Sequence, residues 1–426
     1  MSFYQVNETH DPNLKSWLES ANDPSTDFPL QNLPVCRFIH RNDLKIGIGI
    51  GDFVLDFEPY YNMFIAEGFE KKDLALAVSH KVRKQIIEDF SVSASSSRKN
   101  LISEHLLIPM TSCRFVLPFE IGDYTDFYCS IFHATNVGMM FRPESPLFPN
   151  YKWLPVGYHG RASSVVISGT KIKRPKGQSR IDGGNFPVFA PCKNLDYEVE
   201  VGFFIGKGNE LGRPIPLQKA EEHIFGLCLV NDWSARDIQA WEYQPLGPFL
   251  AKSFATTISP FIVTMEALAP FRVPAFERSE SDPKPLEYLY DENNQNYGGI
   301  DLNLEVYIQT QKMREEGVEP HLLSRSNMKD LYWTIGQMVA HHTSNGCNLR
   351  VGDLIATGTV SGRSKSERGC LLELTWRGTE PIELPTGEIR RFLEDGDEII
   401  IKGYCEREGF RRIGFGECRG IILPAD

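Results

Sequence analysis

The sequence lacks the features that mark membrane, secreted or nucleic-acid-binding proteins. No uninterrupted apolar run approaches the roughly 20 residues of a membrane-spanning helix. The first residues contain neither a basic segment nor an apolar one, so we expect no signal peptide. No run of Lys and Arg with interleaved aromatic residues stands out, and the net charge is -11. These absences predict that neither a membrane nor a nucleic acid is a partner.

Cysteine is sparse, and its spacing matches no disulfide or zinc motif. The nine cysteines are odd in number, widely spread, and include no C-x-x-C pair. Such usage is typical of reduced thiols in the core of a cytosolic protein. We therefore predict a cytoplasmic location. No internal repeat or low-complexity segment is evident either, which argues against a solenoid or propeller.

The sequence does contain enough apolar residues for a sizeable core. With 426 residues, 41% of them hydrophobic and 24% charged, it is typical of a soluble globular protein with more than one unit. The first unit is predicted to contain strands at 35–39, 45–50 and 53–57, helices at 60–68 and 71–90, and a flexible serine-rich connector at 91–97. We expect one domain over residues 1–116 and a second over 117–426.

The second unit is dominated by strand patterns separated by loops rich in glycine and proline. Strands are predicted at 165–167, 188–190, 195–205, 225–230, 262–265, 301–310, 353–356, 371–376 and 398–404. Helices are predicted only at 234–241 and 329–343. The fold class is therefore mainly β, a sandwich or barrel with long decorated loops.

Residues 121–142 concentrate chemically active side chains. Asp126 and Tyr128 share one face if this segment is extended. His133 follows a short apolar run, and the sequence at 136–138 predicts a turn that holds the imidazole at the rim of a cleft. The alternative is that the polar residues only form turns and that His133 is a structural histidine.

Carboxylates recur where strands are predicted. Glu198 and Glu200 lie on one face of a strand, where like charges repel unless a cation or solvent intervenes. Asp232 follows an apolar strand and precedes a helix that Ser234 could cap. With Asp126 they offer four hard oxygen donors, which suit Ca²⁺, Mg²⁺ or Mn²⁺ better than a structural zinc. A solvated edge strand remains the alternative for the two glutamates.

Cationic and amide side chains follow the carboxylates. Arg236, Gln239 and Tyr243 fall along one stripe of the predicted helix, and Lys252 comes shortly after it. Such groups could stabilise an oxyanion or a bound carboxylate, although Arg236 could instead pair with a neighbouring aspartate on the surface. Glu373 is an acid among leucines and needs a buried partner, for which His133 is a candidate.

Together these segments resemble the fumarylacetoacetate hydrolase family. The matching segments are 122–128, 133–138, 154–164, 231–237, 245–249 and 345–350. They span about two thirds of the chain in the family's order. The resemblance implies a small N-terminal SH3-like barrel, a large C-terminal mixed β-sandwich roll, and a homodimer. It also implies hydrolysis of a carbon-carbon bond in a diketo acid, 4-fumarylacetoacetate, to fumarate and acetoacetate, the last step of tyrosine and phenylalanine degradation.

The resemblance also implies roles for individual residues. A catalytic Ca²⁺ would be held by Asp126, Glu198, Glu200 and Asp232, and a second, structural Mg²⁺ by Asp232, Lys252 through its carbonyl, and Thr256. His133 would be the base, Glu373 its orienting partner, and Arg236, Gln239 and Lys252 the oxyanion donors. Substrate contacts would come from Tyr128, Arg142, Tyr158, Gln239, Tyr243 and Thr359.

Two rival functions follow from the same residues. A relative that cleaves acylpyruvates or decarboxylates oxaloacetate would use the same metal site, but the long N-terminal region favours the diketo-acid hydrolase. A scaffold without activity would be expected to lack His133 or Glu373, and both are present. The chain departs from the family at 129–132, where Ile131 and Phe132 make the segment more apolar and leave the rim of the pocket undetermined.

Overall fold

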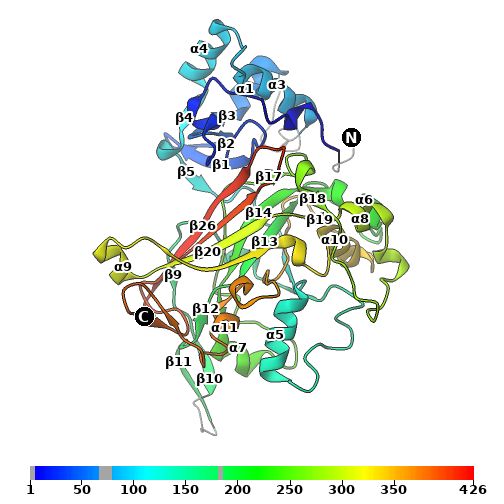
Figure 1. Ribbon diagram of the computed structural model, residues 1–426, viewed down its shortest axis with the longest axis vertical. Helices are drawn as coiled ribbons and strands as arrows, with labels where there is room; N and C mark the ends of the chain where they lie inside the picture. Colours follow the sequence, from blue (N-terminus) through cyan, green and yellow to red (C-terminus); the bar gives the residue numbers. More distant parts are fainter. Residues whose placement is uncertain (1–4, 67–78, 181–185) are drawn as a thin grey trace.

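The structure is a computed structural model that describes residues 5–66, 79–180 and 186–426. In Figure 1 a smaller N-terminal unit lies at one end of a larger body, and a hairpin projects from the opposite end of that body. Both units are built on β-sheets with helices at their edges. The prediction of a mainly β protein is confirmed.

The sheet of the N-terminal unit has the strand order β4-β3-β2-β1-β5. Strands β1 (Val35–His40), β2 (Asp43–Ile50) and β3 (Phe53–Asp56) form an antiparallel meander. β4 (Leu107–Pro109) pairs with β3, and β5 (Arg114–Val116) pairs with β1. The three strands predicted for this unit are therefore confirmed, and the sheet is completed by strands from a later part of the chain.

The helices of this unit correct one prediction. They are α1 (Phe57–Phe64), α3 (His80–Phe90) and α4 (Ser96–His105). The predicted helices at 60–68 and 71–90 lie partly outside the described residues. The predicted connector is confirmed only at 91–95, which separate α3 from α4, because Ser95 Oγ accepts a hydrogen bond from the Arg98 amide at 3.3 Å and starts α4 at Ser96. Serine is a good N-cap, so a serine run can begin a helix as well as separate two.

Two larger sheets form the body. The first has the order β7-β6-β22-β13-β14-β16-β8, with β17 beside β14, and the second the order β21-β20-β25-β26-β9. The strands of the first are β6 (Tyr124–Phe127), β7 (Gly157–His159), β8 (Val165–Ile167), β13 (Val199–Ile205), β14 (Ile224–Asp232), β16 (Thr256–Ile258), β17 (Val263–Thr264) and β22 (Leu354–Ala356). Those of the second are β9 (Ile172–Lys173), β20 (Asn303–Gln309), β21 (His321–Asn327), β25 (Glu398–Cys405) and β26 (Ile413–Leu423).

Glycines let the two sheets approach closely. A Cβ on Gly403 of β25 would lie 2.6 Å from Leu229 Cδ2 of β14, and one on Gly420 of β26 would lie 2.7 Å from the Trp233 ring. Leu229 and Trp233 are fully buried and belong to the main core. Parallel pairs such as β6 with β22 occur beside antiparallel ones, so the body is a mixed β structure.

Shorter elements connect these sheets. The strands are β10 (Lys176–Arg180), β11 (Pro187–Pro191), β12 (Leu195–Asp196), β15 (Ser234–Ala235), β18 (Arg272–Val273), β19 (Gly299–Ile300), β23 (Ile382–Glu383) and β24 (Ile389–Arg390). The helices are α5 (Ile131–Phe141), α6 (Leu217–Ala220), α7 (Arg236–Glu242), α8 (Glu292–Tyr297), α9 (Gln311–Glu316), α10 (Ile335–Thr343) and α11 (Leu371–Leu374). Single 3-10 turns lie at Glu8–His10, Glu19–Asn22, Met110–Ser112, Ala162–Ser164, Glu221–His223, Ala269–Phe271, Glu287–Leu289, Met328–Asp330 and Lys365–Glu367.

Most predicted strands are confirmed, and the exceptions surround the site. The strand predicted at 195–205 is interrupted at 197–198, which separates β12 from β13. The strand predicted at 371–376 is wrong, because this segment forms α11. Ser234 does not cap a helix but pairs with Asp196 in β15. The helix predicted at 329–343 begins only at Ile335, where α10 starts.

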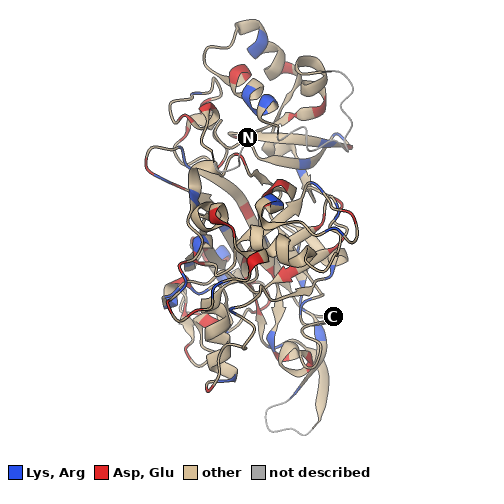
Figure 2. Cartoon of the chain, turned by 90° about the vertical axis from the view of Figure 1, so that its right-hand side faces the viewer, with Lys and Arg blue, Asp and Glu red and all other residues tan. Residues whose placement is uncertain are grey.

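Charge is interspersed over the molecule. Figure 2 shows Lys and Arg alternating with Asp and Glu along the ribbon on the face in view. No helix in the described part of the chain is both long and apolar enough to cross a bilayer. All nine cysteines lie among the described residues, and none forms a disulfide.

Replacing Thr334 by Ala should lower the free energy of unfolding by about 1–2 kcal/mol. Thr334 Oγ1 accepts the Gln337 amide at 3.2 Å at the start of α10, and Asn294 Nδ2 donates to the same oxygen at 2.9 Å. Urea unfolding would measure the change. Ser344→Ala, at the exposed end of α10, is the control and should change stability by less than about 0.5 kcal/mol. Equal effects would contradict the role of the cap.

Candidate active site

The site lies in the larger body, in a cavity of about 420 Å³ that we call the main cavity. Its walls come from β6, β13, α5, α7 and the loops after β22 and α7. Polar and charged groups line one part and apolar side chains another. The polar group comprises Asp126, Tyr128, His133, Arg142, Tyr158, Glu198, Glu200, Arg236, Gln239, Tyr243, Lys252 and Thr359.

Three carboxylates from three strands converge beside this cavity. Asp126 of β6, Glu200 of β13 and Asp232 at the end of β14 each place an oxygen within 4.8 Å of the others, and all three are buried. The sheet brings them together, because β13 pairs with β14 while β22 connects β13 to β6. Sequence analysis grouped these residues, and the strand register places them at one end of the sheet.

The carboxylate cluster carries more negative charge than its neighbours balance. Both oxygens of Glu200 and Oδ1 of Asp126 are buried and receive no hydrogen bond from an amide, hydroxyl or cationic donor among the described residues. Burial, followed by repulsion from the neighbouring acids, raises the pKa of Asp126 and of Glu200 well above the ordinary value. A bound divalent cation would coordinate the oxygens that lack hydrogen bonds and would offset the repulsion between the acids. This donor set therefore fits a hard metal ion.

Glu198 lies next to the cluster but is already paired. Its Oε1 is 2.8 Å from Arg236 Nη1, and its Oε2 accepts a hydrogen bond from Lys252 Nζ. Burial would raise the pKa of Glu198, but Lys252 and then Arg236 lower it below its ordinary value. Glu198 precedes β13 and does not lie within it. It therefore stays ionised between the carboxylate cluster and the two cations.

Lys252 and Thr256 both contact Asp232. Lys252 Nζ donates to Asp232 Oδ2 at 2.6 Å, and Thr256 Oγ1 donates to Asp232 Oδ1 at 3.1 Å. Behind these residues lies a second cavity of about 210 Å³, which Asp232, Lys252 and Thr256 also line. The side chains of the three residues expected at a second metal site are thus adjacent, although the contact of Lys252 is made by its ammonium group and not by the carbonyl expected to bind the metal.

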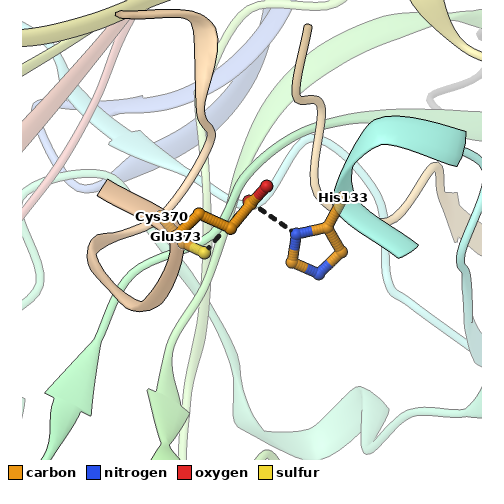
Figure 3. Close-up of side chains that lie close together, drawn as sticks. All are labelled: His133, Cys370 and Glu373. Carbon is orange, nitrogen blue, oxygen red and sulfur yellow. Dashed lines mark hydrogen bonds and ion pairs between the residues drawn. The ribbon is translucent and has the colours of Figure 1, made fainter. Parts of the chain in front are cut away.

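His133 and Glu373 form a buried pair, drawn in Figure 3. His133 Nδ1 donates to Glu373 Oε2 at 2.6 Å, and the two side chains are 3% and 0% exposed. The expected turn at 136–138 is wrong, since these residues continue α5, and His133 lies in its first turn behind the cap Ser130. The partner predicted for Glu373 is nonetheless found, 240 residues away in the sequence.

Three further donors surround Glu373. Asn136 Nδ2 donates to Oε1 at 2.8 Å, while Ser361 Oγ and Cys370 Sγ donate to Oε2 at 2.8 and 3.3 Å. Burial would raise the pKa of Glu373, but His133 and these hydrogen bonds lower it to about 2. Glu373 is therefore a carboxylate at neutral pH, and it holds the His133 proton on Nδ1 so that Nε2 can accept one.

His133, Cys370 and Glu373 could also hold a metal on spacing alone. Their atoms are instead hydrogen bonded to one another. Burial, followed by repulsion from Glu373, raises the pKa of the Cys370 thiol well above its ordinary value, so the sulfur is not the thiolate that a metal binds. The carboxylate cluster is the better metal site.

The expected substrate-contact residues all line the main cavity. Thr359 Oγ1 is buried there with no hydrogen-bond partner among the described residues. The Arg142 guanidinium lies 4.1 Å from the centre of the Phe148 ring, at an edge of the cavity. Tyr158 Oη donates to Asp232 Oδ2 at 3.2 Å. The structure therefore brings these residues together around one space large enough for a small diketo acid.

Ile131 and Phe132, which make this segment more apolar than in the family, do not line the main cavity. The Phe132 ring packs 6.0 Å from that of Phe276 and lies beneath Arg363, in a separate surface cleft on the other side of α5. Because His133 is one residue further along the helix, it points about 100° away, toward the main cavity. The rim of the main cavity is thus independent of this pair.

The sequence did not predict several residues that contact Glu373 or Arg236 without lining the main cavity. Asn136, Ser361 and Cys370 surround Glu373, and Asp196 contacts Arg236. No local pattern distinguishes them, because each acts through a residue distant in the sequence. The sequence placed Asn136 only in a turn and Asp196 only in a strand, with no role at the site for either.

Comparisons with known proteins identify the family. The sequence model of the family described as fumarylacetoacetate (FAA) hydrolase C-terminal matches residues 124–422. Human fumarylacetoacetase is 48% identical over 427 residues, covering 96% of this chain and 99% of the relative. The Caenorhabditis elegans fumarylacetoacetase is 48% identical, covering 94% and 98%. Fumarylacetoacetate hydrolase from psychrophilic Exiguobacterium antarcticum has a similar fold, with a TM-score of 0.50 at 17% identity, covering 92% of this chain and 99% of that one. This chain therefore belongs to the fumarylacetoacetate hydrolase family.

Proposed function

We propose that this protein hydrolyses 4-fumarylacetoacetate to fumarate and acetoacetate, the last step of tyrosine and phenylalanine degradation. The main observation behind the proposal is that His133, held by the buried Glu373, lines the same cavity as Asp126 and Glu200. Asp126 Oδ1 and both Glu200 oxygens are buried and receive no hydrogen bond from an amide, hydroxyl or cationic donor among the described residues. The near-full-length similarity to curated fumarylacetoacetases supports this substrate. The rival acylpyruvate hydrolase would share the site chemistry, so the substrate must be tested directly.

His133 would start the reaction as general base. Held by Glu373 with its proton on Nδ1, it accepts a proton from water on Nε2 while the water oxygen attacks a ketone carbon. The carbonyl oxygen becomes an oxyanion in a tetrahedral intermediate. The carbon-carbon bond then breaks, its electron pair leaves as an enolate, and the proton on His133 returns to the enolate carbon. Fumarate and acetoacetate are the products, and one water is consumed.

Arg236, Gln239 and Lys252 would stabilise the developing oxyanion. Arg236 and Lys252 are buried cations already oriented by carboxylates, and Gln239 Oε1 accepts a hydrogen bond from Arg236 Nη1 at 3.2 Å. Fixed charges in a water-poor site need no reorganisation when the oxyanion forms. Tyr128, Arg142, Tyr158, Tyr243 and Thr359 would bind the substrate, as would Gln239, and orient its ketone toward His133.

We propose Ca²⁺ at Asp126, Glu198, Glu200 and Asp232, and Mg²⁺ at Asp232, Thr256 and the backbone carbonyl of Lys252. Hard oxygen donors and uncompensated buried charge support this assignment. A bound divalent cation would add positive charge that favours an anionic oxygen in the cavity. The His133 proton transfer and the donor positions described above follow from the residues themselves.

Further features of the family are proposed for this chain. They are an SH3-like barrel within residues 1–116, a β-sandwich roll over residues 117–426, a homodimer and a cytoplasmic location. The separate N-terminal sheet supports the first boundary. The exposed aromatic rings of Phe189 in β11 and of Phe186 directly before it offer apolar surface that a second copy could cover. The absence of disulfides among the described residues is compatible with a reducing compartment.

The test is the loss of ultraviolet absorbance of the conjugated diketone when purified protein is added to fumarylacetoacetate. Reactions with and without EDTA, and with acetylpyruvate as alternative substrate, run in parallel. Rapid loss that EDTA prevents and that is largely confined to fumarylacetoacetate is the expected result. Faster cleavage of acetylpyruvate would assign the protein to the acylpyruvate hydrolases, and no cleavage of either with metal restored would refute the enzyme.

Arg236→Ala should lower kcat about 100-fold or more, because one oxyanion donor is worth roughly 3–4 kcal/mol. Steady-state rates at saturating substrate would measure it. Arg174→Ala is a control, since this arginine pairs with Asp395 away from the main cavity, and it should leave kcat within about twofold. A loss below tenfold in Arg236→Ala would contradict the proposed role.

A further inference from the structure

Asp196 is a buried carboxylate that does not line the main cavity and has no role in the scheme above. It is 0% exposed, lies in β12, and pairs through its backbone with Ser234 of β15. This short pairing places Asp196 beside α7, which begins at Arg236. Its carboxylate therefore faces the interior between α7 and α11, behind the residues that contact the cavity.

The two oxygens of Asp196 bind two different catalytic segments. Oδ2 accepts Arg236 Nε at 2.9 Å and the Leu372 amide at 2.9 Å. Oδ1 accepts the Leu371 amide at 2.8 Å. The Leu371 and Leu372 amides immediately precede Glu373, which holds His133. One carboxylate thus joins the segment of the oxyanion donor to the segment of the base.

The other contacts of Arg236 lie on the opposite side of its guanidinium from Asp196. Its Nη1 reaches Glu198 Oε1 at 2.8 Å and Gln239 Oε1 at 3.2 Å on the cavity side, while Asp196 holds Nε from behind. Glu198 alone could pull the guanidinium toward the carboxylate cluster. Asp196 supplies the opposing attraction, so the guanidinium is fixed between two acids.

α11 depends on Asp196 in a similar way. It is a single helical turn, and its first amides have no carbonyl partner within the helix. In a buried segment those amides need an acceptor, and Asp196 provides it for both Leu371 and Leu372. The place of Glu373, two residues from Leu371, is set by these bonds together with its own four donors.

We infer that Asp196 is a positioning residue that fixes Arg236 and the Glu373–His133 pair relative to each other. The inference rests on the proposed function, because the two segments act on one substrate only if that reaction occurs. It deepens the scheme by explaining how an oxyanion donor and a base on separate elements keep one spacing. A misplacement of about 1 Å can slow an enzyme about 100-fold.

Asp196→Asn tests the inference with little change in shape. The amide keeps one acceptor oxygen but sets an NH₂ group against the Arg236 or amide donors. Because Asp196 touches no substrate, kcat should fall about tenfold to hundredfold while KM stays within about threefold. The ¹H NMR resonance of the His133 Nδ1 proton, which reports the bond to Glu373, should also shift or broaden.

Asp353→Asn is the matched control. Asp353 is also a buried carboxylate, 3% exposed, and accepts the Asp123 and Arg350 amides at 3.0 and 2.8 Å, but it contacts neither Arg236 nor Glu373. It should leave both kcat and the imidazole resonance unchanged. Asp196→Glu, which keeps the charge but displaces it, should lower kcat as well and serves if the Asn variant folds poorly.

The outcomes separate the two proposals. The inference would be overturned if either folded Asp196 variant kept the wild-type kcat. It would also be overturned if Asp353→Asn lowered kcat as much as Asp196→Asn does. A fall in kcat with an unchanged imidazole resonance would overturn the link to Glu373. If wild-type protein fails to cleave fumarylacetoacetate, the proposed function fails, whereas the resonance still decides whether Asp196 positions the His133–Glu373 pair.

Discussion

His133→Asn should lower kcat by about 10²–10⁴-fold, the contribution typical of a general base. Asn can donate to Glu373 as the imidazole does, so the buried carboxylate keeps a partner, but it cannot accept a proton from water at neutral pH. KM should change little, because the groups expected to hold the substrate remain in place. Steady-state kinetics at saturating fumarylacetoacetate would measure both constants.

The geometry explains why the base should be His133 and not a nearby carboxylate. Nδ1 is fixed on Glu373 at 2.6 Å, and Nε2 lies 3.9 Å from Glu198 Oε1, beyond hydrogen-bond distance. Glu198 itself is bound to two cations and is a poor proton acceptor. Nε2 is thus free to accept a proton, whereas Asp126 and Glu200, whose unbonded oxygens also line the cavity, belong to the proposed cation site.

Phe132→Leu is a matched control for the histidine variant. It changes the preceding residue of α5, whose ring packs on Phe276 outside the main cavity, and kcat should stay within about twofold. Retention of more than a tenth of wild-type kcat in His133→Asn would contradict the assignment. The proton would then have to go to Glu198 or to solvent.

Several parts of this fold could be predicted because local pattern and tertiary structure agree. The strands of the N-terminal meander alternate and are separated by turn residues, so their bounds were found within a few residues. Glu200 and Asp232 were recognised because each stands in or at the end of an apolar strand, and Asp126 because residues 121–142 concentrate chemically active side chains. Buried charges in such places require a partner, whatever the arrangement of the strands.

Other parts depend on contacts that no local pattern records. Leucines on both sides of Glu373 favour a strand, yet the amides of this segment find their acceptor in Asp196, and the chain turns into α11. Asn136 and Gly138 favour a turn, but Ser130 caps the preceding turn and the helix continues through them. At α11 tertiary hydrogen bonds override propensity, whereas α5 is started by the local Ser130 cap and Asn136 is then held by its bond to Glu373. Both places lie at the site.

Glu200→Gln should abolish cation binding without destabilising the cation-free protein. Both Glu200 oxygens are buried without a hydrogen bond from an amide, hydroxyl or cationic donor among the described residues. The neutral amide therefore removes an unfavourable charge. In wild type, Ca²⁺ at 100 times its Kd should add about 2.7 kcal/mol to the free energy of unfolding. The variant should lose this gain, and its kcat should fall to the level of EDTA-treated wild type.

Glu221→Gln is the matched control for Glu200→Gln. Glu221 is also a buried glutamate, but it is paired with Arg272 through Nη2 at 2.5 Å. Removing its charge should cost about 3 kcal/mol or more, yet it should leave the Ca²⁺-induced gain intact. Denaturant unfolding with EDTA measures the stability of each variant without cation. The same measurement with Ca²⁺ gives the gain that the cation adds. The two variants should thus have opposite effects: one loses stability and keeps the cation response, the other keeps stability and loses the response. If Glu200→Gln instead behaves like Glu221→Gln, the carboxylate cluster is an ordinary buried network, and the excess charge at β6, β13 and β14 needs another explanation than a metal.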